Sequence, residues 1–348
     1  MPEKLKAGEP DEIRAILRSC FSQPIKTRRN KMDISYLLFL QNIREALGPA
    51  VEVFMGIISA IDVHFLIILI PAILYWCINK KDGQFVFFTF AFGEFLNGIL
   101  KLSVCCYRPW IRDSRIIPSQ YAVQGATGYS FPSGHSTVAG SMFVSAGWRL
   151  RNKYHHIVTV VFFVFSALVM FSRNYLTVHT PQDVIVGMSL GIFSIWITTL
   201  FMGWIDKNEK KDIVSVIVAL ISIALAVLYF KYKSYPLDYV NGELLVDPQK
   251  MMVDSFGGAG RFAGIMVAWI LERRFIKFSV EGSAAEKILR FVIGIALILA
   301  VNYLAVPLFQ SVFSAQIAKF CIGFAALFTT VFIVPCTFKP LSKAFNRK

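Results

Sequence analysis

The chain has 348 residues, of which 55% are hydrophobic and only 17% charged, and its mean hydropathy is +0.57. Soluble domains carry about 25% charged residues, so this composition excludes an ordinary soluble protein and indicates a membrane protein. The net charge of +14 first suggests nucleic acid as a partner, but the basic residues lie in short stretches between apolar segments. That distribution is typical of membrane topology and of contact with anionic headgroups, so we expect the bilayer and no nucleic acid as the partner.

The first 60 residues fit no single prediction. Residues 1–33 form a basic tail, either cytoplasmic or interfacial, with eight Lys and Arg residues and no early apolar core, so we expect no cleavable signal peptide. Within this tail, residues 11–21 have apolar residues at helical spacing, which predicts either a short amphipathic helix or a solvated tail. Residues 34–60 are apolar but carry charges and Pro49, and they form either one poor spanning helix or two short interfacial helices.

Nine apolar runs follow, most of them near the ~20 residues that a spanning helix requires. Spanning segments in lipid must satisfy their own backbone hydrogen bonds, so we expect nine or ten spanning helices and an all-α, polytopic membrane helical bundle. The expected helices lie near 62–79, 84–104, 132–148, 155–172, 181–204, 212–230, 257–271, 288–308 and 316–337.

The loops between these runs differ in charge. One set holds sixteen basic residues, and the positive-inside rule places that set in the cytoplasm. The loops at 105–131, 173–180 and 231–256 then lie on the extracytoplasmic or lumenal face, and 231–256 is either a lid or a solvated loop. The sixteen residues are Lys80, Lys81, Arg149, Arg151, Lys153, Lys207, Lys210, Lys211, Arg273, Arg274, Lys277, Lys287, Lys339, Lys343, Arg347 and Lys348.

Two polar clusters lie where apolar runs meet the outer face. The first contains Lys101 and Arg108, two cations that suit an oxyanion with several oxygens, although they could instead snorkel to the headgroups. The second is FPSGH, where we expect a helix with Ser130 as N-cap and Pro132 in its first turn. The amides of Ser133, Gly134 and His135 are then expected to be free to bind an anion, unless this is simply a capped helix start.

The third cluster lies between residues 172 and 183. Thr180 is the expected N-cap, Pro181 the first helical residue and Asp183 the third. His179 then lies within reach of Asp183, which would fix its tautomer and leave its other ring nitrogen as nucleophile or base. Arg173 adds a third cation, and the alternative is a capping box beside an unrelated His and Arg.

Together the clusters supply what phosphoryl transfer requires: charge stabilisation, a nucleophile and a proton donor. No carboxylate cluster for a magnesium or two-metal site is evident, so we expect no metal and no cofactor. The helices after residue 212 carry few candidate catalytic groups.

The motifs resemble the three signatures of the type-2 phosphatidic acid phosphatase superfamily. They occur unbroken and in order, as K-x6-RP at 101–109, PSGH at 132–135 and SR-x5-H-x3-D at 172–183. The resemblance covers roughly residues 60–205 and implies a six-helix phosphatase core. We assign that core to 61–231, and assign an outer loop and additional C-terminal membrane helices to 232–348.

The resemblance also implies roles at the matching positions. His179 would attack phosphorus and become phosphohistidine, Asp183 would orient it, and His135 would protonate the leaving oxygen. The remaining matched residues would hold the phosphate: Lys101, Arg108, Ser133, Gly134 and Arg173.

We therefore expect a membrane enzyme that hydrolyses a lipid phosphomonoester or pyrophosphate without a metal. Phosphatidic acid, phosphatidylglycerol phosphate, sphingoid phosphates and a polyprenyl pyrophosphate such as undecaprenyl pyrophosphate all fit, and the oligomeric state is left open. The alternatives are a lipid-linked phosphotransferase that uses the same phosphohistidine and a non-catalytic lipid transporter.

Overall fold

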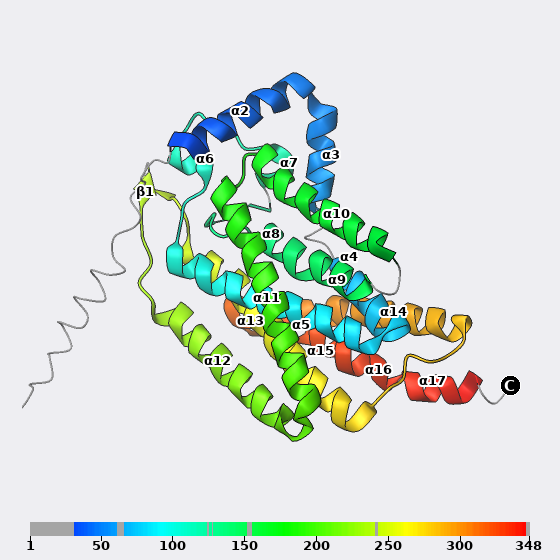
Figure 1. The fold of residues 1–348 in the computed structure, drawn as a ribbon. Helices are drawn as coiled ribbons and strands as arrows, with labels where there is room; N and C mark the ends of the chain where they lie inside the picture. Colours follow the sequence, from blue (N-terminus) through cyan, green and yellow to red (C-terminus); the bar gives the residue numbers. More distant parts are fainter. Residues whose placement is uncertain are drawn as a thin grey trace, which may run out of the picture.

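The computed structural model describes residues 31–345 except 61–65, 124, 127, 152–154 and 241–242. The amphipathic helix expected at 11–21 lies outside the described residues. Within them the protein is helical apart from one short antiparallel pair, β1 (Tyr239–Val240) with β2 (Glu243–Leu244). The prediction of an all-α membrane bundle is confirmed (Figure 1).

Helices occupy all nine expected apolar runs, and several contain a π-helical turn that continues the same rod. Short helices α6 (Pro109–Arg112) and α7 (Gln120–Val123) lie between the long ones. The helices in the nine runs are α4 (Leu66–Ile73, continued to Ile78), α5 (Lys80–Val104), α8 and α9 (Gly134–Val138 and Ser145–Leu150, joined through Ala139–Val144), α10 (His155–Tyr175), α11 (Pro181–Lys207), α12 (Asp212–Tyr232), α13 (Pro248–Leu271, continued to Ile276), α14 (Ala284–Val312), and α15 with α16 (Ala315–Phe328 and Val334–Cys336, joined through Thr329–Ile333), followed by α17 (Phe338–Phe345).

Six helices in the described part of the chain are long and apolar enough to span a membrane. This number is lower than the nine or ten expected, because α4 and the α8–α9 rod are short and α13 carries Asp254 and Arg261 among several glycines. Most residues of α13 are buried against other helices rather than exposed to lipid, so this helix need not be apolar all round. The six are Lys80–Arg112, His156–Tyr175, Pro181–Lys207, Asp212–Tyr232, Ala284–Val312 and Ala315–Leu341.

The ambiguous segment 34–60 forms two helices, α2 (Lys31–Leu47) and α3 (Pro49–Ala60). Gly48 separates them with a φ of +76°, a conformation that glycine adopts without steric cost. Arg44 of α2 donates hydrogen bonds to Thr177 Oγ1 (3.0 Å) and Ile117 O (2.7 Å), so α2 is fixed over the outer loops. A location of the two helices in the membrane interface stays a prediction.

Helix α13 packs against α5 on one side and α15 on the other, in direct backbone contact with α15. A Cβ atom at Gly260 would lie 2.1 Å from Phe320 O, and one at Gly323 would lie 2.3 Å from Gly257 O. Small residues at such positions allow helices to approach closely, which is how membrane helices gain packing energy without a hydrophobic driving force. The C-terminal helices are therefore an integral part of the bundle around α5.

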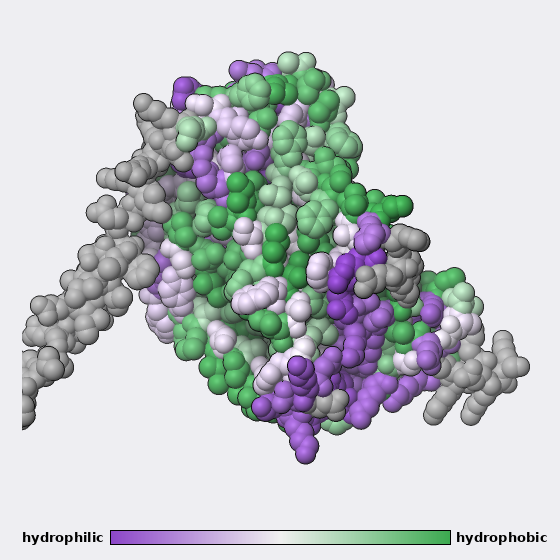
Figure 2. Space-filling model, viewed as in Figure 1, coloured by the Kyte–Doolittle hydropathy of each residue, from purple (hydrophilic) through white to green (hydrophobic). Residues whose placement is uncertain are grey.

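Ion pairs join the helix ends that are expected to face the cytoplasm. Arg149 contacts Asp82 at 2.5 Å, Lys80 contacts Glu272 at 2.6 Å, and Arg274 contacts Asp212 at 2.6 Å. Figure 2 shows hydrophobic surface across the middle of one face and hydrophilic surface gathered at its lower right. This polarity agrees with a bundle that spans the bilayer.

Candidate active site

Lys101 and Arg108 lie on either side of the turn that ends α5. Lys101 Nζ donates to Tyr129 O (3.2 Å) and Pro132 O (2.9 Å). Arg108 donates to Gly128 O through Nε (3.1 Å) and to Val178 O through a terminal nitrogen (3.0 Å). The two cations therefore hold the loops that carry the other two motifs, and both line a cavity, so they do not simply snorkel to the headgroups.

The PSGH motif begins a helix three residues later than expected. Helix α8 starts at Gly134 with Ser133 as N-cap, whose Oγ accepts from Ser136 N at 3.3 Å, so the prediction of Ser130 as the cap was wrong. The prediction of a free Ser133 amide was also wrong, because it donates to Asp183 O at 2.9 Å. Gly134 and His135 provide the first amides of the helix, which lack partners within it, and both residues line the cavity.

The start of α11 matches the expected capping box. Thr180 N donates to Asp183 Oδ2 at 2.8 Å, and Asp183 N donates to Thr180 Oγ1 at 3.4 Å, with Pro181 as the first helical residue. These bonds fix the Asp183 carboxylate at the end of a helix, beside the loop that carries His179.

The hydrogen-bond partners of His179 determine its tautomer. Its Nε2 lies 2.8 Å from a terminal nitrogen of Arg108. A guanidinium only donates, so Nε2 accepts and the proton of the neutral ring is assigned to Nδ1. Nδ1 faces Ser130 Oγ at 3.4 Å and Asp183 Oδ2 at 3.5 Å. The nitrogen with a lone pair is thus the one beside the cation.

Ser130 is a site residue that the sequence did not reveal. Its hydroxyl donates to Asp183 Oδ2 at 2.6 Å, which is shorter than the contact between Asp183 and His179. Asn174, also unpredicted, donates to the backbone oxygen of His179 at 2.9 Å. The signal available for Ser130 was only its place beside PSGH, which we interpreted as a helix cap.

The electrostatic surroundings of His179 favour its neutral form. Burial lowers the pKa of His179 well below its usual value of about 6.5, and Arg108, Arg173 and Lys101 lower it further. A charged imidazole would be desolvated beside three cations, so the ring stays unprotonated at neutral pH.

The eight predicted site residues divide into two groups. Three do not line the cavity. They are Ser133, Arg173 and Asp183, which expose 0%, 1% and 2% of their surface. Arg173 donates to Ser59 Oγ of α3. The five that line the cavity are Lys101, Arg108, Gly134, His135 and His179.

The cavity has a volume of about 420 Å³ and extends beyond the three motifs. It is also lined by Glu94 of α5, Asp254 and Arg261 of α13, and Lys319 of α15. The expectation of few functional groups after residue 212 missed the last three. A charged residue within an apolar helix was the available signal, because such residues are costly in a membrane and mark functional sites.

Within the described residues, no group of three or more His, Cys, Asp or Glu side chains is placed to hold a metal ion. The polar side chains on the motif side of the cavity are mainly cations and imidazoles. Such a set binds an anion rather than a cation.

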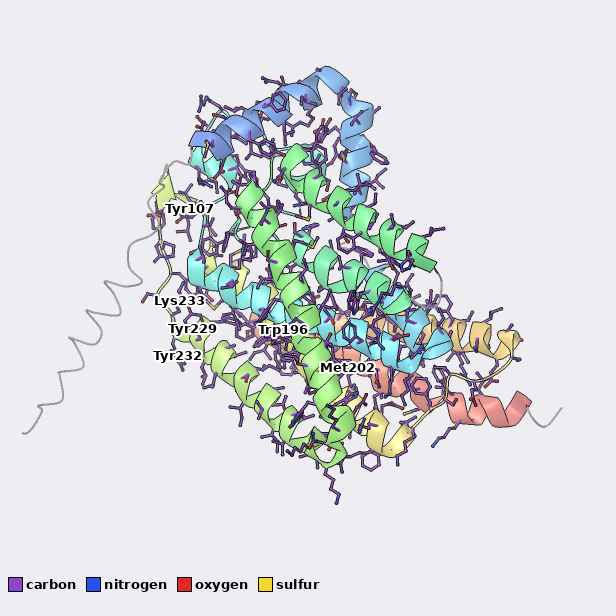
Figure 3. All side chains as sticks on the ribbon, viewed as in Figure 1. Tyr107, Trp196, Met202, Tyr229, Tyr232 and Lys233 are labelled. Carbon is purple, nitrogen blue, oxygen red and sulfur yellow. The ribbon has the colours of Figure 1, made fainter. Side chains whose placement is uncertain are left out.

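Residues 233–238 are fastened beside the end of α5, near the labelled Lys233 and Tyr107 (Figure 3). Lys233 Nζ donates to Leu102 O and to Ser103 O (3.2 Å), which satisfies carbonyls at the helix C-terminus. Tyr107 donates to Asp238 Oδ2 at 2.7 Å. Residues 248–256 form the first turns of α13, so the expected loop is shorter than predicted, and neither a lid nor a solvated loop describes it fully.

Three curated proteins illustrate what the chain is similar to. It is 30% identical over 152 residues to phosphatidylglycerophosphatase B of Bacillus subtilis (strain 168), covering 42% of this chain and 70% of that protein. It is 25% identical over 200 residues to lipid phosphate phosphatase delta of Arabidopsis thaliana, covering 55% and 45% of the two chains. It is 29% identical over 119 residues to lipid A 1-phosphatase of Rhizobium johnstonii, covering 34% and 47%.

Two family models and one solved structure also match the chain. Residues 84–207 match the PAP2 superfamily, and residues 256–345 match a transmembrane extension of PAP2 superfamily phosphatases. The crystal structure of a transmembrane PAP2 type phosphatidylglycerolphosphate phosphatase from Bacillus subtilis shares 25% identity, with a TM-score of 0.43, over 55% of this chain and 94% of that one. The chain therefore belongs to the PAP2 superfamily of membrane phosphatases, the family that its three motifs resemble.

Proposed function

We propose that this protein hydrolyses a phosphomonoester or pyrophosphate of a membrane lipid through a phosphohistidine at Nε2 of His179. The observation that carries the proposal is the orientation of this ring. Its Nδ1 faces the Ser130–Asp183 pair, and its Nε2 lies at the cavity wall, 2.8 Å from Arg108. A neutral imidazole held in this tautomer is a nucleophile that needs no prior deprotonation.

In the first step, Nε2 of His179 attacks phosphorus while the bond from phosphorus to the lipid oxygen breaks. The leaving oxygen takes a proton from the imidazolium form of His135, which lines the same cavity and for which the bound phosphate anion supplies a counter-charge. The positive charge that develops on the His179 ring is stabilised through Nδ1 by Asp183, whose carboxylate Ser130 and Thr180 hold in place.

The phosphoryl oxygens gain negative charge in this step, and the cations on the cavity wall stabilise it. Lys101 and Arg108 already bind backbone carbonyls, so they are fixed before substrate arrives. The amides of Gly134 and His135 add donors at a helix N-terminus. Preorganised donors of this kind are each worth on the order of 10²–10³ in rate. Because these groups supply the charge, the reaction is proposed to need no metal.

In the second step, water attacks the phosphohistidine. His135 accepts a proton from this water, the P–N bond breaks, and inorganic phosphate is released with His179 neutral again. Each step therefore uses the same two imidazoles: His135 acts first as acid and then as base, and His179 acts first as nucleophile and then as leaving group.

The substrate is proposed to be a lipid because the cavity lies within a bundle of membrane helices. The relatives named above act, by their names, on phosphatidylglycerophosphate, lipid phosphates and lipid A, which supports a lipid phosphate here. The motifs lie at the helix ends opposite the basic loops, so we propose that the site opens to the extracytoplasmic or lumenal face.

The test is phosphate release by purified protein in detergent, with and without EDTA. Phosphatidic acid, phosphatidylglycerol phosphate and undecaprenyl pyrophosphate are the substrates, and His179→Ala is the matched variant. The proposal expects release that survives EDTA and is lost in the variant. Release lost in EDTA would contradict metal independence, and release that persists in the variant would contradict the nucleophile.

A further inference from the structure

Besides the motif residues, four charged side chains line the cavity, Glu94, Asp254, Arg261 and Lys319, which we call the extension cluster. Arg261 and Lys319 lie within the matched transmembrane extension, and Asp254 lies two residues before it. None of the four belongs to the three motifs. Charged groups among membrane helices are costly unless they are paired or bind something, so the cluster requires an explanation.

Glu94 and Arg261 form an ion pair, in which each charge neutralises the other. Arg261 Nε lies 2.5 Å from Glu94 Oε2, and a terminal nitrogen lies 2.8 Å from Oε1, which is a two-point pair between α13 and α5. Such a pair is geometrically specific and neutral overall. It joins α13, which runs into the transmembrane extension, to α5, the helix that carries Lys101.

Asp254 and Lys319 have no such pairing among the described residues. Among the described residues, no hydrogen bond or ion pair engages either side chain, although both line the cavity. The position of Lys319 is set by the close packing of α13 on α15: a Cβ atom at Gly257 would lie 3.1 Å from Lys319 Cγ and 3.7 Å from a terminal nitrogen of Arg261. Asp254 is an exposed residue of α13. The cavity thus presents one carboxylate and one ammonium on a rigid wall.

The distance between the phosphate site and the extension cluster limits which part of a bound lipid can contact Asp254 and Lys319. Glu94 and Lys101 are seven residues apart on α5, or about 10 Å along one helix face. Both line the cavity, so a lipid whose phosphate reaches His179 places the groups next to that phosphate within reach of the extension cluster. A lipid with nothing polar there would remove water from Asp254 and Lys319 without replacing its hydrogen bonds, which is unfavourable.

We propose that the extension cluster binds a neutral, hydroxyl-bearing group, such as a glycerol, that neighbours the phosphate of the substrate. A hydroxyl donates to Asp254 and accepts from Lys319. It adds no net charge to a cluster whose four formal charges sum to zero. A second phosphate would be repelled by Asp254 as it is attracted by Lys319. This inference rests on the proposed function and assigns the transmembrane extension a role in choosing the substrate.

The test measures binding rather than turnover, so that it does not depend on catalysis. His179→Ala protein in nanodiscs is titrated with phosphatidic acid and with phosphatidylglycerol phosphate of identical acyl chains. The second lipid carries an additional phosphodiester and glycerol before its terminal phosphate, and phosphatidylethanolamine, which has the phosphodiester without the glycerol, separates the two contributions. The titrations are repeated with Lys319→Met and with Asp254→Asn in the same background. Lys250→Met, an exposed position on the first turn of α13, is the control.

The proposal predicts that the His179→Ala protein binds phosphatidylglycerol phosphate more tightly than phosphatidic acid. Lys319→Met removes a charged donor and should weaken binding of the glycerol lipid about tenfold or more, and Asp254→Asn leaves a weaker, neutral acceptor and should weaken it less. Neither variant should change the binding of phosphatidic acid, and Lys250→Met should change the binding of neither lipid. Tighter binding in Asp254→Asn would mean that the site receives an anion and would overturn the proposal. Equal affinities of all variants for both lipids would also overturn it.

A competition experiment tests whether the extension cluster binds a zwitterionic group instead of a hydroxyl group. Phosphatidylglycerol should displace phosphatidylglycerol phosphate from the His179→Ala protein. Displacement by phosphatidylethanolamine but not by phosphatidylglycerol would identify a zwitterionic occupant and contradict the hydroxyl assignment. Loss of phosphate release from every lipid, by contrast, would remove the proposed function while these binding results still decided the inference.

Discussion

Replacement of Ser130 by Ala tests the part of the site that the motifs did not reveal. The change removes a hydroxyl that donates to Asp183 Oδ2 at 2.6 Å and lies 3.4 Å from His179 Nδ1. A hydrogen bond to a charged group is worth about 1.5–3 kcal/mol, which corresponds to roughly 10-fold to 100-fold in rate. Thr180 N continues to donate to the same oxygen at 2.8 Å, so we expect a fall in kcat near the lower limit, about tenfold.

The assay is phosphate release at varied lipid concentration, because a residue that positions the nucleophile should lower kcat and leave KM nearly unchanged. Ser145→Ala is the control: this serine is equally buried on the α8–α9 rod, but it bonds Met142 O away from the cavity. Thermal stability of both variants is measured in parallel. A kcat equal to wild type in Ser130→Ala, or an equal loss in Ser145→Ala, would refute the reasoning.

Three other predictions concern charge and packing. Because the pKa of His179 is lowered, phosphate release should persist as pH falls through the usual range near 6.5 and be lost only at lower pH; Arg108→Gln, which removes a cation, should move this acid limit of the pH profile upward. Lys101→Met should lower kcat on the order of 10²–10³-fold in the same assay, and an unchanged kcat would exclude a role in charge stabilisation. Gly260→Ala should lower the melting temperature, because its Cβ would lie 2.1 Å from Phe320 O, whereas Gly203→Ala, with nothing within 4 Å, should not.

The chemistry of the third motif could be predicted because it is local. Thr180, Pro181 and Asp183 follow one another at the start of one helix, and a capping box needs only that spacing. The position of His179 beside Asp183 follows from the same few residues.

The start of α8 could not be predicted in the same way. Pro132 is a common first residue of helices, yet the helix begins at Gly134. Ser133 N bonds the Asp183 carbonyl of another helix, and Ser130 Oγ bonds the Asp183 carboxylate. These bonds join residues about fifty positions apart, so spacing along the chain does not reveal them.

The extension cluster shows the same limit more strongly. Asp254 and Arg261 lie on α13 and Lys319 is the single charge of α15, and nothing in their spacing indicates that they line one cavity with Glu94. Their meeting depends on close glycine contacts between α13 and α15, which depend in turn on which helices are neighbours. Sequence could flag each charge as costly but could not group them.

The most direct test of the account is to trap the covalent intermediate. Purified protein is mixed with phosphatidylglycerol phosphate labelled in its terminal phosphate, quenched in alkali within one turnover, digested and sequenced by mass spectrometry. The account predicts label on the peptide that contains His179, stable to alkali and released by acid, and no label on that peptide in His179→Ala. Label on another residue, or phosphate release by His179→Ala at the wild-type rate, would contradict it.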